Sequence, residues 1–358
     1  MNQLVPVLLV PNMQLYKYQL INRIGQGSFG EVWSAIDLAL QREFAVKFLK
    51  PGVSVDERLR EGQIGNLLSH NNLVRVHQAD VVNVGGADVV ALAMDYLPDG
   101  SVETLANPAG YVPLPLVLRI ARDILQGLDY LHARNFYHND IKPGNILLGP
   151  QQQAMLSDYG ITGVSSDGNP VAAPNSYLLH CAPEVRATGN VGVSSDIFQA
   201  GMTLARMLLG LNHLSAIWAS VGRSQYENDM DAGKLLSQKD FPNHIPAAVR
   251  RVILTAVHPD PAQRYSSSLE MRRAIEKLNF PGYWSVDASG REFGVDHAHR
   301  YTFELLPVSG ARFDFVCVRE NIASGRTQRI VRFCQRGLAA KQAEKAVSDF
   351  KCFVVTGR

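Results

Sequence analysis

The chain has 358 residues and is 46% hydrophobic, so it is long enough for two or three compact units with well-filled cores. Lys and Arg number 35 against 33 for Asp and Glu, and the net charge of +2 excludes a generally basic nucleic-acid-binding protein. Its four cysteines include no CxxC pair, which predicts neither a structural zinc site nor a disulfide framework and favours a reducing, cytoplasmic location.

The predicted N-terminal segment, residues 1–15, contains the apolar run VPVLLVP at 5–11. This run lacks a basic leader and a small-residue cleavage site, so we interpret it as a packing segment and not as a signal peptide. No other run approaches the roughly 18 consecutive apolar residues of a membrane helix. We therefore expect a chain that does not contact a membrane.

Residues 16–50 are predicted to form three antiparallel strands, because apolar residues alternate on either side of GQGSFG. The segment carries a GxGxxG pattern, formed by Gly25, Gly27 and Gly30. A dinucleotide-binding turn shares this pattern but opens a helix, whereas EVWSAI here continues as a strand. The context favours a loop whose backbone N–H groups cover phosphates.

Further along, apolar residues recur at helical spacing in three segments that are predicted to be helical, at 115–132, 197–211 and 247–278. Between the first two lies HNDIKPGNILLGPQQQAMLSDYG, at 138–160. Four polar side chains stand around its apolar ILL strand: Asp140, Lys142, Asn145 and Asp158. Each alone is more often a solvated loop residue, but the whole pattern rarely arises by chance.

This stretch, with the glycine-rich pattern and the AVK strand at 45–47, resembles the eukaryotic-type Ser/Thr protein kinases over about residues 16–278. The resemblance implies an α+β bilobal fold, with a β-rich N-lobe at 16–97 and an α-rich C-lobe at 98–279. The compact length and the additional C-terminal residues are similar to those of bacterial or phage-borne members. The implied activity is transfer of the ATP γ-phosphate to hydroxyls of protein substrates.

The resemblance implies a role for each polar residue of the stretch, because phosphoryl transfer depends on positioning and metal ions. Asp140 is the candidate base that orients a substrate hydroxyl. Asn145 and Asp158 are the candidate Mg²⁺ ligands, since this ion prefers oxygen donors. Lys142 steadies the transferred phosphate as a compact cation, and a lysine at this place accompanies Ser/Thr kinases.

The resemblance also implies an ATP site between the lobes. Lys47 is the expected cation for the α- and β-phosphates, held by Glu61 of a helix that, with the following strand, is predicted within residues 60–74. Phe29 is expected to cap the tip of the glycine-rich loop. The other implied nucleotide contacts come from that loop, its flanking strands, a gatekeeper and the hinge: Gly25, Gly27, Gly30, Val32, Ala45, Met94, Asp95 and Leu97.

Two structural supports are implied outside the site. Glu184 in the APE sequence, which closes the activation segment at 158–184, is expected to form a buried ion pair with Arg264. Asp196 is expected to brace, from the next helix, the loop that carries Asp140, Lys142 and Asn145, which we call the catalytic loop.

Three departures from the family pattern bear on mechanism. Gly62 and Gly65 each weaken the predicted helix by about 0.8–1 kcal/mol relative to alanine, so we hypothesise that it is easily displaced and that Gly65→Leu stabilises it or raises activity. Asn139 replaces an arginine that grips an activation-loop phosphate, which predicts activity without obligatory loop phosphorylation. Tyr177 stands where the family commonly has threonine, which leaves the substrate-site geometry open.

Residues 280–358 are predicted to form an accessory β-rich domain with strands at 301–306, 313–319 and 329–334 and a helix at 338–350. His297 and His299 are interpreted as surface histidines and not as metal ligands. Four arginines are predicted to lie along one strand: Arg326, Arg329, Arg332 and Arg336. They form either a docking surface for an anionic partner, an acidic protein or a nucleic acid, or, as we favour, an ordinary solvated face.

The main alternative function is a pseudokinase, a binding or scaffold module that transfers no phosphate. Against it, the chain retains all five residues whose loss usually marks such modules: Lys47, Glu61, Asp140, Asn145 and Asp158. A small-molecule kinase would share the Asp and Asn loop, but the APE, DYG and AVK sequences argue against it.

Overall fold

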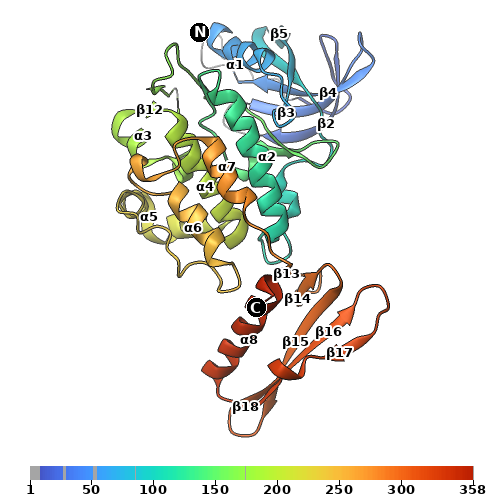
Figure 1. Ribbon diagram of the computed structural model, residues 1–358. Helices are drawn as coiled ribbons and strands as arrows, with labels where there is room; N and C mark the ends of the chain where they lie inside the picture. The colour runs from blue at the N-terminus through green and yellow to red at the C-terminus, as the bar shows by residue number, and fades with distance from the viewer. Residues whose placement is uncertain (1–8, 27–29, 51–54, 85, 174, 358) are drawn as a thin grey trace.

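The computed structural model describes residues 9–26, 30–50, 55–84, 86–173 and 175–357, and Figure 1 shows three parts in chain order. The first is a sheet with one helix, the second is mainly helical, and the third is again a sheet with one helix. The predicted α+β bilobal fold with an added C-terminal part is therefore confirmed. Within the described ranges, every helix is too short or too polar to cross a membrane.

The N-lobe is built on an antiparallel sheet with the strand order β1-β2-β3-β4-β6-β5. The strands are β1 (Gln14–Leu15), β2 (Tyr18–Gln26), β3 (Gly30–Asp37), β4 (Arg42–Leu49), β5 (Val76–Val84) and β6 (Ala87–Met94). The three strands predicted within residues 16–50 are β2, β3 and β4. Trp33 and Val46 are paired across β3 and β4 and point into the lobe's core. Lys47, the next residue, therefore points to the opposite face. Gly27 and Phe29 lie outside the described residues.

Helix α1 (Val55–Leu67) packs against β5 and begins earlier than predicted. The prediction placed this helix and the following strand within residues 60–74, but the strand starts only at Val76. The first turns of α1 read VDERLRE, with few apolar residues. Hydrophobic periodicity therefore could not mark where the helix begins.

The two glycines of α1 allow the helix to approach β5 closely. A Cβ atom on Gly62 would lie 2.7 Å from Ala79 Cβ, and one on Gly65 would lie only 2.2 Å from Val76 Cγ2. Larger side chains at these positions would push the helix off the sheet. These distances argue against the expectation that leucine at position 65 stabilises the helix, because the glycines allow the close packing on β5.

The C-lobe is built from helices around one apolar core. The helices are α2 (Leu114–His132), α3 (Pro183–Thr188), α4 (Val193–Leu209), α5 (His213–Asp231), α6 (Ala247–Ala256) and α7 (Ser268–Glu276). Helix α2 agrees with its prediction. The segment 247–278 forms two helices and not one, because Pro259 and Pro261 interrupt it. Helix α5 was not predicted, and its regular pattern is broken at Gly222, whose φ is 79°.

Short elements at the edge of the C-lobe carry the polar residues of 138–160. The chain runs through β7 (Phe136–Tyr137), the 3-10 turn η2 (Pro143–Asn145), and the hairpin of β8 (Ile146–Leu148) with β9 (Ala154–Leu156). The activation segment contains β10 (Gly163–Val164), β11 (Val171–Ala172) and η3 (Leu178–His180). Strand β10 pairs with β7, and β11 pairs with β12 (Asn190–Val191), so the segment is attached to the lobe at two places.

The C-terminal part is an antiparallel sheet covered on one face by helix α8 (Ala340–Thr356) (Figure 1). Its strands are β13 (Gly282–Val286), β14 (Glu292–Asp296), β15 (His299–Val308), β16 (Arg312–Asn321), β17 (Thr327–Arg329) and β18 (Gln335–Leu338). The rings of Trp284, Phe315 and Phe350 meet edge to face between sheet and helix. Strands β13 and β14 were not predicted.

The strand predicted at 329–334 is wrong. Only Arg329 of that stretch belongs to a strand, and Val331–Phe333 form the 3-10 turn η5. Strands β17 and β18 both pair with β16, and η5 joins them. The four arginines predicted to lie along one strand are therefore spread over a loop, β17, η5 and β18. The helix predicted at 338–350 instead spans Ala340–Thr356.

The C-terminal part packs on the C-lobe at the end remote from the N-lobe (Figure 1). Asn107 Nδ2 donates a hydrogen bond to Ser285 Oγ at 3.4 Å across this contact. A cavity of about 80 Å³ is lined by Tyr111 and Leu208 from the C-lobe and by Trp284 from β13. The two parts therefore share apolar surface, and the domain boundary near residue 279 stays a prediction.

The close contact between α1 and β5 predicts that Gly65→Leu destabilises the protein. We expect overpacking against Val76 to lower the free energy of unfolding by about 1–3 kcal/mol, measured by denaturant titration. Gln63→Leu is the matched control, because Gln63 is exposed on the same helix and its replacement should change stability by less than about 0.5 kcal/mol. Equal stabilities of the two variants would contradict the packing argument.

Candidate active site

The site begins with three charged side chains that come together from different elements. Lys47 Nζ on β4 lies 2.8 Å from Glu61 Oε1 on α1 and 2.8 Å from Asp158 Oδ1, which follows β9. The predicted pairing of Lys47 with Glu61 is therefore present. One ammonium joins a strand, a helix and a C-lobe loop that are far apart in the sequence.

Burial makes this cluster electrostatically strong. Burial alone would lower the pKa of Lys47, but the charges of Glu61 and Asp158 outweigh it and hold that pKa above its usual range. Burial raises the pKa of Glu61 to about 7, because the attraction of Lys47 offsets only part of the desolvation. For Asp158, the charge of Lys47 outweighs burial, and its pKa lies below its usual range. Lys47 and Asp158 therefore remain charged at neutral pH.

The predicted nucleotide-contacting residues of the sheet share one face. Val32 is paired with Lys47 across β3 and β4, and Ala45 is paired with Met94 across β4 and β6. Directly opposed residues of an antiparallel pair lie on the same face, as do residues two apart along a strand. Val32, Ala45 and Met94 therefore share the face of Lys47, opposite to the core.

The glycine-rich loop and the hinge flank this face. Gly25, near the end of β2, packs close to Val32, and a Cβ on Gly25 would lie 3.5 Å from Val32 Cβ. Gly30 begins β3 at a place where a Cβ would lie 2.1 Å from the carbonyl oxygen of Phe48, so only glycine fits. Asp95 starts the hinge, with its backbone N–H donating to Arg75 O, and Leu97 is buried two residues on.

Helix α4 holds the catalytic loop through hydrogen bonds made by its buried side chains. Asp196 is fully buried and accepts hydrogen bonds from the backbone N–H groups of His138 and Asn139, both at 2.8 Å. The predicted brace is therefore present. Gln199, one turn further along α4, donates to Asn139 O and accepts from Ile141 N, both at 2.9 Å.

Sequence reasoning missed Gln199. The available signal was its spacing of three residues from Asp196, which places both side chains on one helix face.

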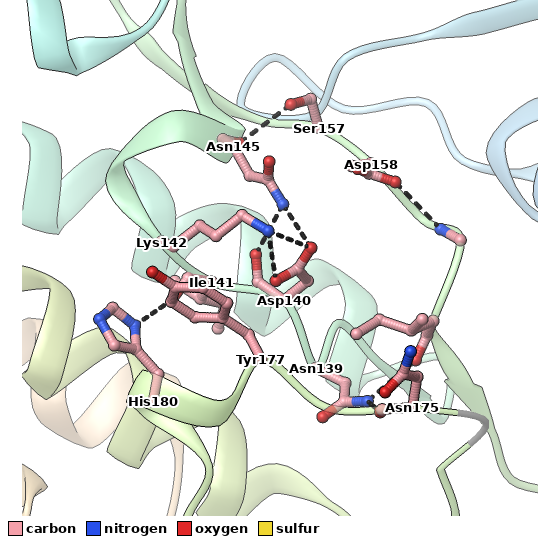
Figure 2. Close-up of polar contacts among 12 residues, drawn as sticks. Asn139, Asp140, Ile141, Lys142, Asn145, Ser157, Asp158, Asn175, Tyr177 and His180 are labelled. Atoms are coloured by element: carbon pink, nitrogen blue, oxygen red, sulfur yellow. Dashed lines mark hydrogen bonds and ion pairs between the residues drawn. The ribbon is translucent and has the colours of Figure 1, made fainter. Parts of the chain in front are cut away.

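The Asp140 carboxylate is bonded on both oxygens (Figure 2). Lys142 Nζ donates to Oδ1 at 2.9 Å and to Oδ2 at 2.8 Å. Asn145 Nδ2 donates to Oδ2 at 2.8 Å and to the backbone oxygen of Asp140 at 3.0 Å. The structure thus brings together three of the four polar residues predicted in this stretch.

Asp158 stands next to this group in a constrained backbone conformation. Its φ is 70°, which is uncommon for a residue other than glycine. In this conformation its carboxylate contacts Lys47 Nζ. The preceding Ser157 donates from its N–H and Oγ to the backbone oxygen of Asn145, at 2.9 and 3.0 Å. Tyr159 is buried, and its hydroxyl donates toward Val74 O at 2.9 Å. These contacts hold Asp158 and Asn145 in register.

The donor set fits a magnesium ion. With Nδ2 of Asn145 directed at Asp140, its amide oxygen remains as the acceptor, and Asp158 supplies a carboxylate. Mg²⁺ is commonly held by one or two carboxylates, other oxygens and substrate phosphates. No group of three or more His, Cys, Asp or Glu side chains suited to a metal exists among the described residues. Phosphate oxygens would supply further ligands to a Mg²⁺ ion held by these two residues.

Asn139 ties the activation segment to the catalytic loop without a charge (Figure 2). Its Nδ2 donates to Ile161 O at 3.1 Å near the start of the segment and to Asn175 O at 2.8 Å near the end. The φ of Asn139 is 64°, a conformation that asparagine tolerates better than most residues. A neutral amide here makes the connection for which the family uses a charged pair.

The second predicted support is also present. Arg264 Nη1 and Nη2 donate to the two carboxylate oxygens of Glu184 at 2.6 and 2.8 Å, and the Arg264 side chain has no exposed surface. A two-point contact between guanidinium and carboxylate fixes direction as well as distance. It anchors the end of the activation segment to the loop before α7.

A sheet-based lysine paired with a helical glutamate, above a loop with Asp, Lys and Asn and a following aspartate, defines the bilobal protein-kinase class. The chain belongs to the protein kinase domain family, whose model matches residues 18–277.

Curated proteins similar to the chain include three bacterial serine/threonine-protein kinases. PknB of Mycobacterium leprae is 26% identical over 271 residues, covering 74% of this chain and 43% of PknB. PrkC of Bacillus subtilis is 27% identical over 272 residues, covering 73% and 40%. PknJ of Mycobacterium tuberculosis is 29% identical over 280 residues, covering 74% and 46%. The chain thus spans less than half the length of these relatives.

Proposed function

We propose that the chain is a protein serine/threonine kinase that transfers the γ-phosphate of ATP to hydroxyl groups of protein substrates. The observation that carries the proposal is the contact of Lys47 Nζ with both Glu61 and Asp158 at 2.8 Å. This contact joins the lobes beside the face where the phosphates of a nucleotide fit. The relatives' designation as serine/threonine-protein kinases supports the hydroxyl specificity.

Each residue then has a defined part in the transfer. Asp140 accepts a hydrogen bond from the substrate hydroxyl and takes its proton as the oxygen bonds to the γ-phosphorus and the bond to the ADP oxygen breaks. Lys142 contacts the transferred phosphate from its place beside Asp140, and Lys47 holds the α- and β-phosphates. Asn145 and Asp158 would hold Mg²⁺, which would neutralise phosphate charge when bound.

The remaining nucleotide contacts are proposed for the loop and hinge residues. Backbone groups of Asp95 and Leu97 face adenine, Met94 limits the depth of the pocket, and Val32 and Ala45 cover the base. Gly25, Gly27 and Gly30 bring backbone N–H groups to the phosphates. We also propose a cytoplasmic location, supported by the four described cysteines, all of which are free thiols.

The proposal predicts that Asp140→Ala and Lys47→Ala abolish phosphate transfer. With radiolabelled ATP and Mg²⁺, the wild-type protein should label itself or a protein in a cell lysate. The rate of labelling should be at least about 100-fold lower in both variants. Asp56→Ala is the matched control, because Asp56 is an exposed aspartate of α1. If wild type binds nucleotide but labels nothing, the pseudokinase alternative replaces the kinase.

The Asn139 contacts predict activity without loop phosphorylation. A variant with Ser165, Ser166 and Ser176 changed to alanine should keep most of the wild-type rate. Asn139→Asp should lower kcat by about tenfold, because it removes the Nδ2 donor and sets a carboxylate against two carbonyl oxygens.

Asn169→Asp is the control for Asn139→Asp, since Asn169 is an exposed asparagine of the same segment. Near-total loss of activity in the triple alanine variant would show that a phosphate is required after all.

Although the sequence favoured an ordinary solvated face for the four arginines, we further propose that the C-terminal part docks an acidic segment of a protein partner. The sequence has no acidic residue between Glu320 and Glu344, and this interval holds four exposed arginines: Arg326, Arg329, Arg332 and Arg336. Within the described C-terminal part, the Lys and Arg ion pairs are Arg300 with Asp287 and Lys351 with Glu292. The four arginines of the interval therefore take part in no ion pair there.

The surroundings favour protein over nucleic acid. Single-stranded nucleic acids stack on free aromatic faces. Phe333, the aromatic residue of η5, instead packs against Phe353 and lies under Arg332.

This docking proposal predicts that a fluorescent Asp/Glu-rich peptide binds wild type and loses affinity as salt rises. The triple variant Arg326→Gln, Arg329→Gln, Arg336→Gln should bind at least about tenfold more weakly, since each exposed ion pair contributes up to about 1 kcal/mol. Arg332 is left in place because it packs on Phe333. Equal peptide binding by both proteins, or a preference for a single-stranded oligonucleotide, would contradict the proposal.

A further inference from the structure

Tyr177, in the activation segment, lies over the catalytic loop (Figure 2). Lys142 Nζ is 4.7 Å from the centroid of the Tyr177 ring. The same ammonium donates to both oxygens of Asp140, at 2.9 and 2.8 Å. The face of an aromatic ring attracts a cation at this distance. The Lys142 ammonium is therefore held by a carboxylate and by a ring.

The ring is itself fixed through its hydroxyl. Tyr177 OH accepts a hydrogen bond from Arg206 Nη1 on α4 at 3.2 Å. Arg206 is buried, and its Nε and Nη2 donate to Leu211 O at 2.9 and 2.8 Å. A guanidinium bound at several points moves little, so it sets where the Tyr177 ring stands.

His180 supports the ring from the side. The Tyr177 and His180 rings meet edge to face, with centroids 5.0 Å apart and an angle of 72° between planes. His180 Nδ1 donates to the catalytic-loop carbonyl of Ile141 at 2.8 Å. Burial, aided by the charge of Arg206, lowers the pKa of His180 to about 3, so the ring stays neutral. Neither Arg206 nor His180 was singled out by the sequence.

We propose that Tyr177 is a positioning residue that acts through Lys142. Its ring holds the Lys142 ammonium beside Asp140, where the ammonium can contact the transferred phosphate. The inference rests on the proposed kinase activity. Tyr177 acts by the electron density of its ring face. A threonine, which the family commonly has here, offers a hydroxyl and no ring. The tyrosine therefore replaces a hydrogen bond with a cation–ring contact.

The test varies the ring's electron density at nearly constant shape. Tyr177 is replaced by phenylalanine and by phenylalanines carrying one, two or three ring fluorines, and also by leucine. Each fluorine weakens the attraction of the ring face for a cation. We expect kcat to fall stepwise along the series and to be about tenfold lower for Tyr177→Leu than for Tyr177→Phe, with KM for ATP unchanged.

Two controls separate positioning from packing. The same fluorinated residues at Tyr265, a half-buried tyrosine before α7, should leave kcat unchanged. In a Lys142→Gln background the series at Tyr177 should be flat, because the cation is gone. A flat series in wild type, or an equal decline in both backgrounds, would overturn the inference. Because the fluorinated residues keep the shape of the ring, they decide the outcome even if Tyr177→Leu fails to fold.

A second measurement does not depend on activity. In protein labelled with ¹³C at the lysine Cε, the ring should shift the Lys142 ε-methylene proton signal upfield, and Tyr177→Leu should abolish that shift. Lys142→Arg identifies the signal. An unshifted Lys142 signal in wild type overturns the positioning role. A shifted signal in a protein that transfers no phosphate places the failure in the proposed function.

Discussion

The contact of one buried ammonium with two carboxylates determines the rest of the active-site geometry. Lys47 meets Glu61 and Asp158 at 2.8 Å each. Charges removed from water are stabilised only when their partners are placed accurately, so β4, α1 and the turn after β9 must keep their relative positions. The close packing of Gly65 on Val76 supplies that accuracy in the N-lobe, because it sets the distance between helix and sheet.

In the C-lobe, helix α4 has the corresponding task for the catalytic loop. Asp196 and Gln199 bind four backbone groups of the catalytic loop from one helix face, three N–H groups and one carbonyl. Arg206, two turns further along α4, donates a hydrogen bond to the Tyr177 hydroxyl. A helix with a buried polar face is stable because each polar group on it has a partner. The activation segment is attached to the same platform through Tyr177 and, by way of Glu184 and Arg264, to the loop before α7.

Two departures from the family pattern have a common physical form. Asn139 makes amide hydrogen bonds where a charged pair is usual, and Tyr177 offers a ring where a hydroxyl is usual. In both contacts the activation segment supplies an uncharged group, a backbone carbonyl or the Tyr177 ring. Neither contact includes a phosphate. The described residues of the C-terminal part lie away from this region, because that part packs on the far end of the C-lobe (Figure 1).

The sequence by itself determined the residue types at the site. Its short patterns in a fixed order resemble the protein kinases, and that resemblance implied the order of elements and the pairs Lys47–Glu61 and Glu184–Arg264. The sequence did not determine where α1 begins, the existence of β13 and β14, or the arginines' division between β17, η5 and β18, since weakly periodic segments are defined by what they pack against. Only the tertiary structure explained Gly65 and brought Tyr177 over Lys142. Those contacts join residues from separate elements, and no local pattern encodes the distance between them.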